Sequence, residues 1–324
     1  KLDEEEIYGL FPTDPAKPYN TIDILKRLVD DSHLTEYKKD YEDNNRQSML
    51  ENILFPVRNI NEKRLQERVE NKTILITGAS YGIGAALIPI LAEYTVTLLL
   101  VARTEERLAT LKKSIVDNAC NVKIYAADLR DENEISNLLE LWKNENINVD
   151  IIINNAGKSI YRKLWNSLDR FHDTQRCAAT NYTGPVQLIL GVLNGLLQKE
   201  AHIINVSAIN VLLPPAVGWS AYQSSKVAFD QWLKCSEAEL KAENISVSSI
   251  YLPLVRTRMS MVNENKHGQP AMSKEKAAKL ITNYIINRKR RYTPWWFGVV
   301  RLSAFIFPGT LYRIQLRQIK KADK

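Results

Sequence analysis

The chain has 324 residues, of which 45% are hydrophobic and 25% are charged, and its formal net charge is +7. This composition excludes a disordered or fibrous protein and suffices for one large α/β domain with extensions. The three cysteines and four histidines show no metal-ligand spacing, so we predict no metal site and a reducing, cytoplasmic location. Residues 1–20 are acidic and contain prolines, unlike a secretion signal.

The excess of positive charge lies mainly near the C-terminus. The chain contains no zinc-finger or RNA-stacking motif, so we expect no nucleic-acid partner. A phosphorylated small molecule or an anionic membrane surface is the partner that this charge favours.

The first 71 residues lie outside the pattern of the main domain. The segment Ile7-Tyr-Gly-Leu-Phe-Pro-Thr-Asp-Pro-Ala-Lys-Pro is followed by an amphipathic run. It resembles the segment that joins the two halves of the carboxyltransferase (β) subunit of acyl-CoA carboxylases, but no active site of that family is included. We therefore expect residues 1–45 to form an appendage and residues 46–71 to form a helical linker.

The chain is organised around Thr73-Ile-Leu-Ile-Thr-Gly-Ala-Ser-Tyr-Gly-Ile-Gly84. A β-branched, apolar run predicts a buried strand, and three glycines lead from it into an apolar helix. Gly78 permits a tight turn, Gly82 lets the backbone approach a pyrophosphate, and Gly84 lets the helix pack on the strand. This pattern indicates a nucleotide site at the positive end of the helix.

Predicted strands and helices alternate after this turn. The strands are expected at 96–101, 122–126, 149–153, 202–206 and 246–251, and the helices at 105–118, 132–143, 168–197 and 221–241. The long helical run should break near Gly184-Pro185. Alternation of this kind predicts an α/β fold, a doubly wound, Rossmann-type parallel sheet of about seven strands.

Three more motifs follow at later strands and helices. Asn154-Asn-Ala-Gly157 follows a strand, Asn181 lies in a helix, and Tyr222-x-x-x-Lys226 opens another helix. With the glycine turn, they resemble the short-chain dehydrogenase/reductase family over residues 72–294. The resemblance implies an oxidoreductase that uses a nicotinamide cofactor.

The resemblance also assigns the cofactor contacts. These are Gly78, Ser80, Tyr81, Gly82, Ile83, Gly84, Arg103, Asp128, Asn154, Ala156, Gly157, Tyr222, Lys226 and Thr257. Arg103 ends the second strand, where an acidic residue would bind the ribose hydroxyls of NAD. A guanidinium suits the 2′-phosphate, so NADP(H) is favoured over NAD(H).

Tyr222 and Lys226 lie one helical turn apart and share a face. Reduction of a carbonyl by hydride needs a proton donor as negative charge develops on oxygen. The resemblance gives that role to Tyr222, with Lys226 lowering the tyrosine pKa and Asn181 linking the lysine to solvent through a water.

The serine that holds the substrate carbonyl departs from the family pattern. In Asn205-Val-Ser-Ala, Ser207 stands first and Ala208 occupies the position at which the family has its catalytic serine. Neighbouring residues of a strand point to opposite faces. Either a bulge redirects Ser207, which we take as the fourth catalytic residue, or Tyr222 acts with a neighbour such as Asn210.

Three segments resemble the bacterial fatty acyl-CoA reductase branch of the family: Asn155-Ala-Gly-Lys-Ser-Ile-Tyr-Arg, Leu168-Asp-Arg-Phe-His-Asp and Ile250-Tyr-Leu-Pro-Leu-Val-Arg-Thr-Arg-Met. The implied reaction is NADPH-dependent reduction of a long-chain acyl-CoA to an aldehyde. One alternative is a ketone or alcohol oxidoreductase acting on a 3-oxoacyl or steroid-like compound. Another is an NADP-binding scaffold with little turnover.

The C-terminal tail, residues 295–324, is apolar and basic. Within residues 288–312, four basic residues precede an aromatic stretch that Arg301 and Pro308 interrupt. This pattern suits peripheral contact with a membrane, or cover for the substrate cleft or a dimer surface. Homo-oligomerisation through the helices of Asn181 and Tyr222 is expected from the resemblance.

Overall fold

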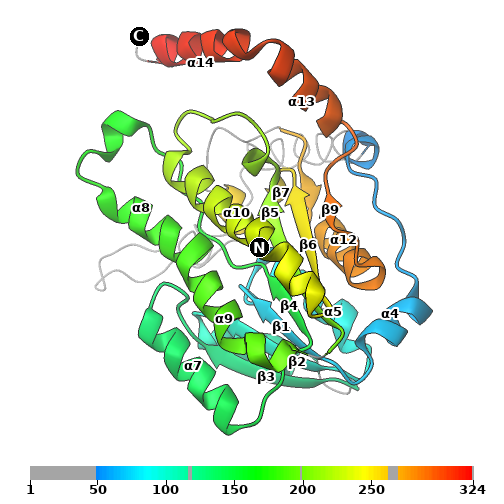
Figure 1. Ribbon diagram of the computed structural model, residues 1–324. Helices are drawn as coiled ribbons and strands as arrows, with labels where there is room; N and C mark the ends of the chain where they lie inside the picture. The colour runs from blue at the N-terminus through cyan, green and yellow to red at the C-terminus, as the bar shows by residue number, and fades with distance from the viewer. Residues whose placement is uncertain (1–48, 116–118, 198, 262–268, 323–324) are drawn as a thin grey trace, which may run out of the picture. The chain divides into compact units, whose positions relative to one another are not determined.

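The computed structural model describes residues 49–115, 119–197, 199–261 and 269–322 (Figure 1). The predicted appendage at 1–45 lies outside the described residues. The chain divides between Ile53 and Leu54, and the fold described below is that of the unit from Leu54 onward.

A seven-stranded parallel sheet forms the centre of this unit. Its order is β3-β2-β1-β4-β5-β6-β9, with β1 Thr73–Thr77, β2 Thr97–Ala102, β3 Asn121–Ala126, β4 Ile151–Asn154, β5 Ala201–Ala208, β6 Ile245–Leu252 and β9 Arg291–Tyr292. The central strands are buried on both faces, which is why their sequences are nearly continuous runs of Ile, Leu and Val. The prediction of a doubly wound sheet is confirmed.

Helices cover both faces of the sheet (Figure 1). One core contains residues of α4 (Glu62–Val69), α5 (Gly82–Ala92), α6 (Glu105–Lys113) and α12 (Lys274–Asn287). The other contains residues of α7 (Glu132–Asn144), α9 (Gly184–Leu196) and α10 (Ser220–Ala242). The two faces of the sheet therefore bury separate apolar cores, as expected for a doubly wound fold.

The helical run before β5 differs from the prediction. Helix α8 spans Phe171–Ala178, a π-helical turn occupies Ala179–Thr183, and α9 begins at Gly184. Pro185 lies in the first turn of α9, where no N–H donor is needed, so it opens the helix and does not break it. A Cβ on Gly184 would lie 1.9 Å from the carbonyl oxygen of Leu129, which explains the glycine.

Short elements complete the carboxyl edge of the sheet. They are the 3₁₀ helices η1 (Leu164–Ser167) and η3 (Ile209–Val211), the paired strands β7 (Val255–Arg256) and β8 (Met272–Ser273), and α11 (Arg258–Met261). Two helices follow β9, namely α13 (Phe297–Ile306) and α14 (Pro308–Ala322). Within the part of the chain that the structure describes, no helix combines the length and apolarity needed to cross a bilayer.

Candidate active site

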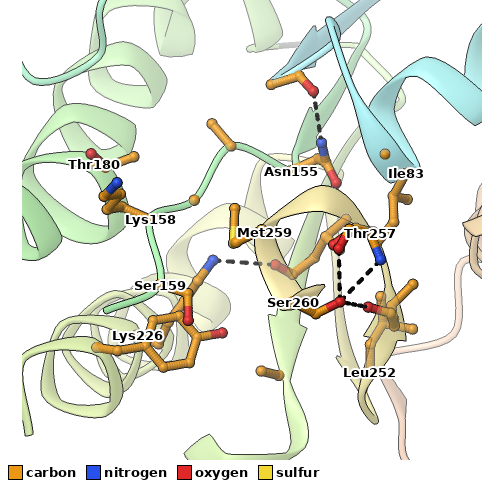
Figure 2. Close-up of a pocket in the computed structure, with 18 of the residues that line it drawn as sticks. Ile83, Asn155, Lys158, Ser159, Thr180, Lys226, Leu252, Thr257, Met259 and Ser260 are labelled. Atoms are coloured by element: carbon orange, nitrogen blue, oxygen red, sulfur yellow. Dashed lines mark hydrogen bonds between the residues drawn. The ribbon is translucent and has the colours of Figure 1, made fainter. Parts of the chain in front are cut away.

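A cavity of about 510 Å³ lies at the carboxyl ends of the central strands. Its wall includes the turn after β1, the segment after β4, the end of β5, the start of α10 and the loop after β6. The sheet order reverses between β1 and β4, and ligands of doubly wound sheets bind outside such a switch point. Figure 2 shows Lys226 and Ser159 on one side of this cavity and Ile83 and Thr257 on the other.

The glycine turn has the conformation that the sequence predicted. Gly78 and Gly82 have φ values of +66° and +58°, which residues with a side chain rarely adopt. A Cβ on Gly84 would lie 2.3 Å from the carbonyl oxygen of Gly78. The Asn155 side chain holds the turn by donating from Nδ2 to the carbonyl oxygens of Thr77 (3.1 Å) and Gly78 (3.2 Å). The turn thereby leaves space at the N-terminus of α5, where the free N–H groups and the helix dipole favour an anion.

Charged side chains surround the cavity beyond β2 and β3. Arg130 donates from Nε to both carboxylate oxygens of Asp128, at 3.0 and 2.9 Å. Burial acts to raise the pKa of Asp128, but the hydrogen bonds and charge of Arg130, together with Arg103, hold it below the ordinary value. Arg103 is exposed on the cavity wall and has no hydrogen-bond partner among the described residues. It is the guanidinium that remains available to a ligand.

Two further arginines pack on Tyr81 at the glycine turn. Arg107 donates from Nε to the tyrosine hydroxyl at 2.8 Å, and its Cζ lies 4.9 Å from the ring centre. Arg258 lies 5.4 Å from the same ring centre and borders the cavity. The open turn, the helix start and this positive charge fit the phosphates of a dinucleotide.

Tyr222 and Lys226 both border the cavity from α10. Burial raises the pKa of Tyr222 to about 12, with a smaller contribution from Cys177. This is opposite to the direction expected from the sequence, because desolvation of the phenol dominates. Burial lowers the pKa of Lys226 to about 8. At neutral pH, Tyr222 is therefore a protonated donor beside a charged lysine whose Nζ lies 3.5 Å from the Val206 carbonyl oxygen.

Asn181 is buried behind the cavity wall, at the π turn between α8 and α9. Its Oδ1 accepts from the Lys158 N–H at 2.8 Å, and its Nδ2 donates to the Lys158 carbonyl oxygen and to Ser225 Oγ, both at 2.9 Å. The side chain thus fixes the segment after β4 against α10. Gly157 lies between Asn181 and Lys226, since a Cβ there would be 3.4 Å from both Oδ1 and Nζ.

Ser207 borders the cavity without a bulge. The pairing of β5 with β6 runs without interruption from Ala201 opposite Ile245 to Ala208 opposite Leu252. Ser207 Oγ is buried and lacks a hydrogen-bond partner among the described residues, as does Asn210 Oδ1. Each is a polar atom at the cavity whose hydrogen-bonding capacity is unused within the described structure.

An aromatic row extends from Tyr222 and Trp219 on the cavity wall to Tyr161. The Trp219 ring lies 5.6 Å from the Tyr222 ring and 5.2 Å from the Tyr161 ring, measured between centres. Gly218 has a φ of +79°, and a Cβ on it would lie 2.4 Å from the Tyr161 ring. The chain turns sharply here and brings the segment after β4 to the start of α10.

Most of the predicted site residues meet at this cavity. Those on its wall are Gly78, Ser80, Tyr81, Gly82, Ile83, Arg103, Asp128, Ala156, Gly157, Ser207, Tyr222, Lys226 and Thr257. Gly84, Asn154 and Asn181 lie behind it, and Asn154 Oδ1 accepts from the Thr77 hydroxyl at 3.4 Å. The sequence did not indicate Arg130, Trp219 or Arg258. Of these, only Trp219 could have been found from the sequence, because it lies three residues before Tyr222, just ahead of the helix.

Cys177 lies beneath the site as a buried thiol. Burial raises its pKa to about 11, so it is protonated at neutral pH and packs as an apolar side chain. Among the described residues, no three His, Cys, Asp or Glu side chains gather in a way that could hold a metal ion.

The lysine pKa leads to a pH prediction. Because Lys226 loses its proton as the pH rises through about 8, any reaction at this cavity that needs the ammonium should slow above that pH. We expect kcat/KM for such a reaction to fall about tenfold per pH unit between pH 8.5 and pH 10. A pH–rate profile measures this, with Lys226→Arg as the comparison, since arginine stays charged. A flat wild-type profile to pH 10 would exclude this role of the lysine.

Comparison with known proteins shows which family and which proteins this chain is similar to. The family model for short chain dehydrogenases matches residues 72–268. A fatty acyl-CoA reductase of Acinetobacter baylyi is 41% identical over 71% of this chain and 78% of its own length. A second one, from Mycobacterium tuberculosis, is 34% identical over 69% of this chain and 76% of its own length.

The fold also has solved counterparts. The crystal structure of a 3-oxoacyl (acyl-carrier-protein) reductase from Agrobacterium tumefaciens C58 with NADP bound superposes with a TM-score of 0.61. The sequences are 20% identical, and the match covers 70% of this chain and 90% of that chain. At that identity, the likeness concerns the fold alone.

Proposed function

Because the chain belongs to the short-chain dehydrogenase family, we propose that it is an NADPH-dependent reductase that converts long-chain fatty acyl-CoA to the aldehyde. Family membership makes it an oxidoreductase with a nicotinamide cofactor. The finer proposal is supported by the cavity in which Tyr222, Lys226 and Ser207 lie together, and by the 41% identity with a fatty acyl-CoA reductase.

The residues that would hold the cofactor follow from the geometry of the site. The glycine turn and the start of α5 suit the pyrophosphate, and Arg103 with Ser80 suits the 2′-phosphate. Lys226 stands on the other side of the cavity, on α10, whereas Thr257 lies beside the glycine turn, since a Cβ on Gly82 would be 3.2 Å from its Cγ2. When bound, NADPH supplies the hydride.

The protein's own residues handle the charge that forms on the thioester oxygen. Ser207 holds that oxygen by a hydrogen bond, and the neutral phenol of Tyr222 gives it a proton. Charged Lys226 stabilises the tyrosinate that remains. The thiohemiacetal then loses CoA thiol and leaves the aldehyde. Overall, one acyl-CoA, one NADPH and one proton yield one aldehyde, one CoA thiol and one NADP⁺.

The wall of the cavity supports a lipid-like substrate. The segment after β6 contributes Leu254, Val255 of β7 and Met259 of α11, and η3 contributes Ile209. Apolar side chains opposite a catalytic tyrosine suit an acyl chain. The alternative, a ketone reductase for 3-oxoacyl or steroid-like compounds, would use the same wall.

Product identity separates these two reactions. The purified protein is incubated with NADPH and either palmitoyl-CoA or 3-oxohexadecanoyl-CoA, and the products are analysed by mass spectrometry. The proposal requires hexadecanal from the first substrate. Formation of 3-hydroxyhexadecanoyl-CoA from the second substrate, with no aldehyde from the first, would contradict the proposal and support the ketone reductase alternative.

Arg103 provides a test of the cofactor preference. Replacing Arg103 by leucine removes the guanidinium proposed to bind the 2′-phosphate, so the KM for NADPH should rise about 10- to 100-fold, as a lost charge-assisted hydrogen bond predicts. The KM for NADH should change little. Steady-state kinetics with both cofactors measures this, with Lys113→Gln at the exposed end of α6 as the control. Equal changes for both cofactors would count against a 2′-phosphate site.

The C-terminal helices support peripheral contact with a membrane through residues 288–312. Trp295, Val299 and Phe305 are exposed, and Phe305 is 83% exposed. Residues 295–322 contain five Arg and Lys residues and no Asp or Glu. Gln315 donates to the carbonyl oxygen of Pro215 at 3.0 Å, which puts α14 beside the loop that leads to the cavity. An anionic bilayer bound here would deliver acyl chains near that cavity.

We also propose that the protein forms a homo-oligomer through the helices that carry Asn181 and Tyr222. Leu190 on α9 and Val227 on α10 are 55% and 40% exposed. Apolar side chains on neighbouring helices suit packing against a second copy.

A further inference from the structure

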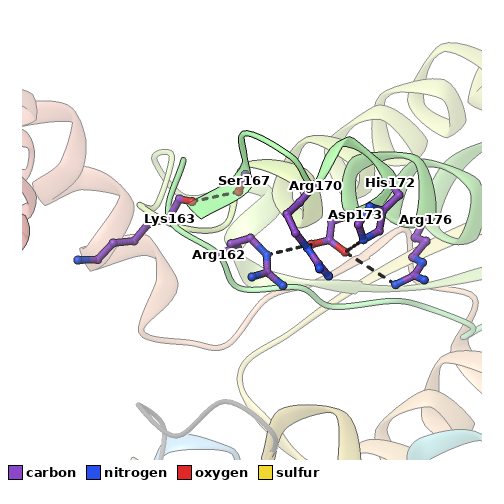
Figure 3. A network of polar contacts seen from close by, with 7 residues as sticks. All are labelled: Arg162, Lys163, Ser167, Arg170, His172, Asp173 and Arg176. Carbon is purple, nitrogen blue, oxygen red and sulfur yellow. Dashed lines mark hydrogen bonds and ion pairs between the residues drawn. The ribbon is translucent and has the colours of Figure 1, made fainter. Parts of the chain in front are cut away.

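A cluster of cationic side chains surrounds one buried carboxylate at the start of α8 (Figure 3). The Asp173 side chain is 7% exposed and accepts from Arg162 Nε at 2.9 Å and from Arg170 Nε at 3.4 Å. Arg176 Nη1 lies 3.9 Å from its other oxygen, and His172 Nε2 lies 3.5 Å from it. Burial acts to raise the pKa of Asp173, but the two bonded arginines hold it below the ordinary value. The cluster therefore contains one carboxylate and three permanent cations.

The positive charge of this cluster is only partly neutralised. Residues 162–176 include four Arg and Lys residues but two acids, Asp173 and the exposed Asp169. The charge of Asp173 balances that of one arginine. Arg162 and Arg170 are bonded through Nε, and their terminal nitrogens make no hydrogen bond to another described residue. The three arginine side chains are 35%, 37% and 47% exposed. Asp173 thus orients the guanidinium groups and leaves their donors open to solvent.

A series of contacts links the cluster to the cavity wall. The N–H of Arg162 donates to the carbonyl oxygen of Gly218 at 2.8 Å. The preceding residue, Tyr161, packs on Trp219, which packs on Tyr222. A row of three aromatic rings therefore connects the catalytic phenol to the residue that begins the cluster.

We propose that Arg162, Arg170 and Arg176 bind the phosphate groups at the nucleotide end of an acyl-CoA substrate. Planar guanidinium groups bind phosphate oxygens in pairs, and groups already oriented by a carboxylate lose little freedom on binding. The pantetheine arm of CoA separates the thioester from the phosphates, so the two ends need separate sites. This inference rests on the proposed reduction of acyl-CoA.

Phosphate esters also occur in lipid headgroups, and exposed Trp165, Leu168 and Phe171 lie in the same segment. The compact arrangement of the arginines around a single carboxylate favours one bound molecule over a broad surface. Binding to a membrane would instead draw on charges spread over a wide area.

The test compares two substrates that differ only in the phosphorylated nucleotide end. Steady-state KM values are measured with palmitoyl-CoA and with palmitoyl-pantetheine, which carries the same thioester without the nucleotide. The variants are Arg170→Gln and Arg176→Gln. The control is Arg64→Gln, at an exposed position of α4. Arg176 has no hydrogen bond to Asp173 in the structure, so its replacement leaves the bonded pair of Arg162 and Asp173 intact.

We expect the KM for palmitoyl-CoA to rise about tenfold in each variant and the KM for palmitoyl-pantetheine to change less than twofold. Equal changes for both substrates would assign the arginines a structural role and overturn the proposal. No change with either substrate would overturn it as well. If the variants lose binding to phosphatidylglycerol vesicles while the KM for palmitoyl-CoA is unchanged, the cluster binds lipid headgroups and the proposal is overturned.

A wild-type protein that reduces neither thioester would refute the proposed function separately. Calorimetric titration with adenosine 3′,5′-bisphosphate, at saturating NADP⁺, then still tests the cluster. Binding that Arg176→Gln weakens about tenfold supports a site for the nucleotide of CoA, and absence of binding overturns it.

Discussion

Replacement of Tyr222 by phenylalanine is expected to lower kcat/KM for carbonyl reduction by about 100- to 10,000-fold. The phenol borders the cavity and is held in its protonated form by burial. We propose it as the group that gives a proton to the developing oxyanion. Removing one hydroxyl leaves the packing of α10 nearly unchanged, so NADPH affinity should stay within about twofold of wild type.

Tyr94→Phe is the control for this substitution. Tyr94 follows α5 and packs on the apolar core, remote from the catalytic helix. Kinetics and a fluorescence titration of NADPH would be measured on both variants. If the Tyr222→Phe protein keeps more than a tenth of wild-type activity, another group donates the proton.

Replacement of Gly84 by alanine is expected to weaken NADPH binding at least tenfold and to lower the free energy of unfolding by about 1–3 kcal/mol. The added Cβ would lie 2.3 Å from the Gly78 carbonyl oxygen and 2.9 Å from Asn155 Nδ2. Relief of these contacts requires α5 to move away from the turn. That movement would displace the backbone N–H groups that are proposed to face the pyrophosphate.

Gly298→Ala in α13 is the matched control, because a Cβ at Gly298 meets nothing within 4 Å. It should change neither NADPH affinity nor the unfolding midpoint appreciably. Fluorescence titration and urea unfolding measure both quantities. An unchanged NADPH affinity in Gly84→Ala would mean that the turn does not bind the cofactor.

Much of the fold could be predicted because its signals are local. The apolar runs that became β1, β2 and β4 are buried on both faces, so each strand is recognisable from a few adjacent residues. Gly78 was predicted to permit a tight turn, and its φ of +66° agrees. Strand β9 was not located, because two residues carry no periodicity.

The parts of the site that escaped prediction depend on contacts between distant segments. Arg130 and Arg258 reach the cavity from loops after β3 and β7, which the fold alone brings together. The rise of the Tyr222 pKa could not be predicted either, because the tyrosine–lysine spacing shows the nearby charge but not the burial of the phenol. The pairing of Asn181 with the Lys158 backbone also depends on the π turn, for which the sequence shows no signal.

The central claim is that this protein reduces an acyl-CoA thioester, and the stoichiometry of NADPH and thiol tests it most directly. The protein is mixed with NADPH and palmitoyl-CoA, and loss of reduced nicotinamide absorbance and release of free CoA thiol are followed in one cuvette. We predict that the two changes are equal and that both disappear in Tyr222→Phe. Oxidation of NADPH without thiol release, or NADPH binding without oxidation, would contradict the claim.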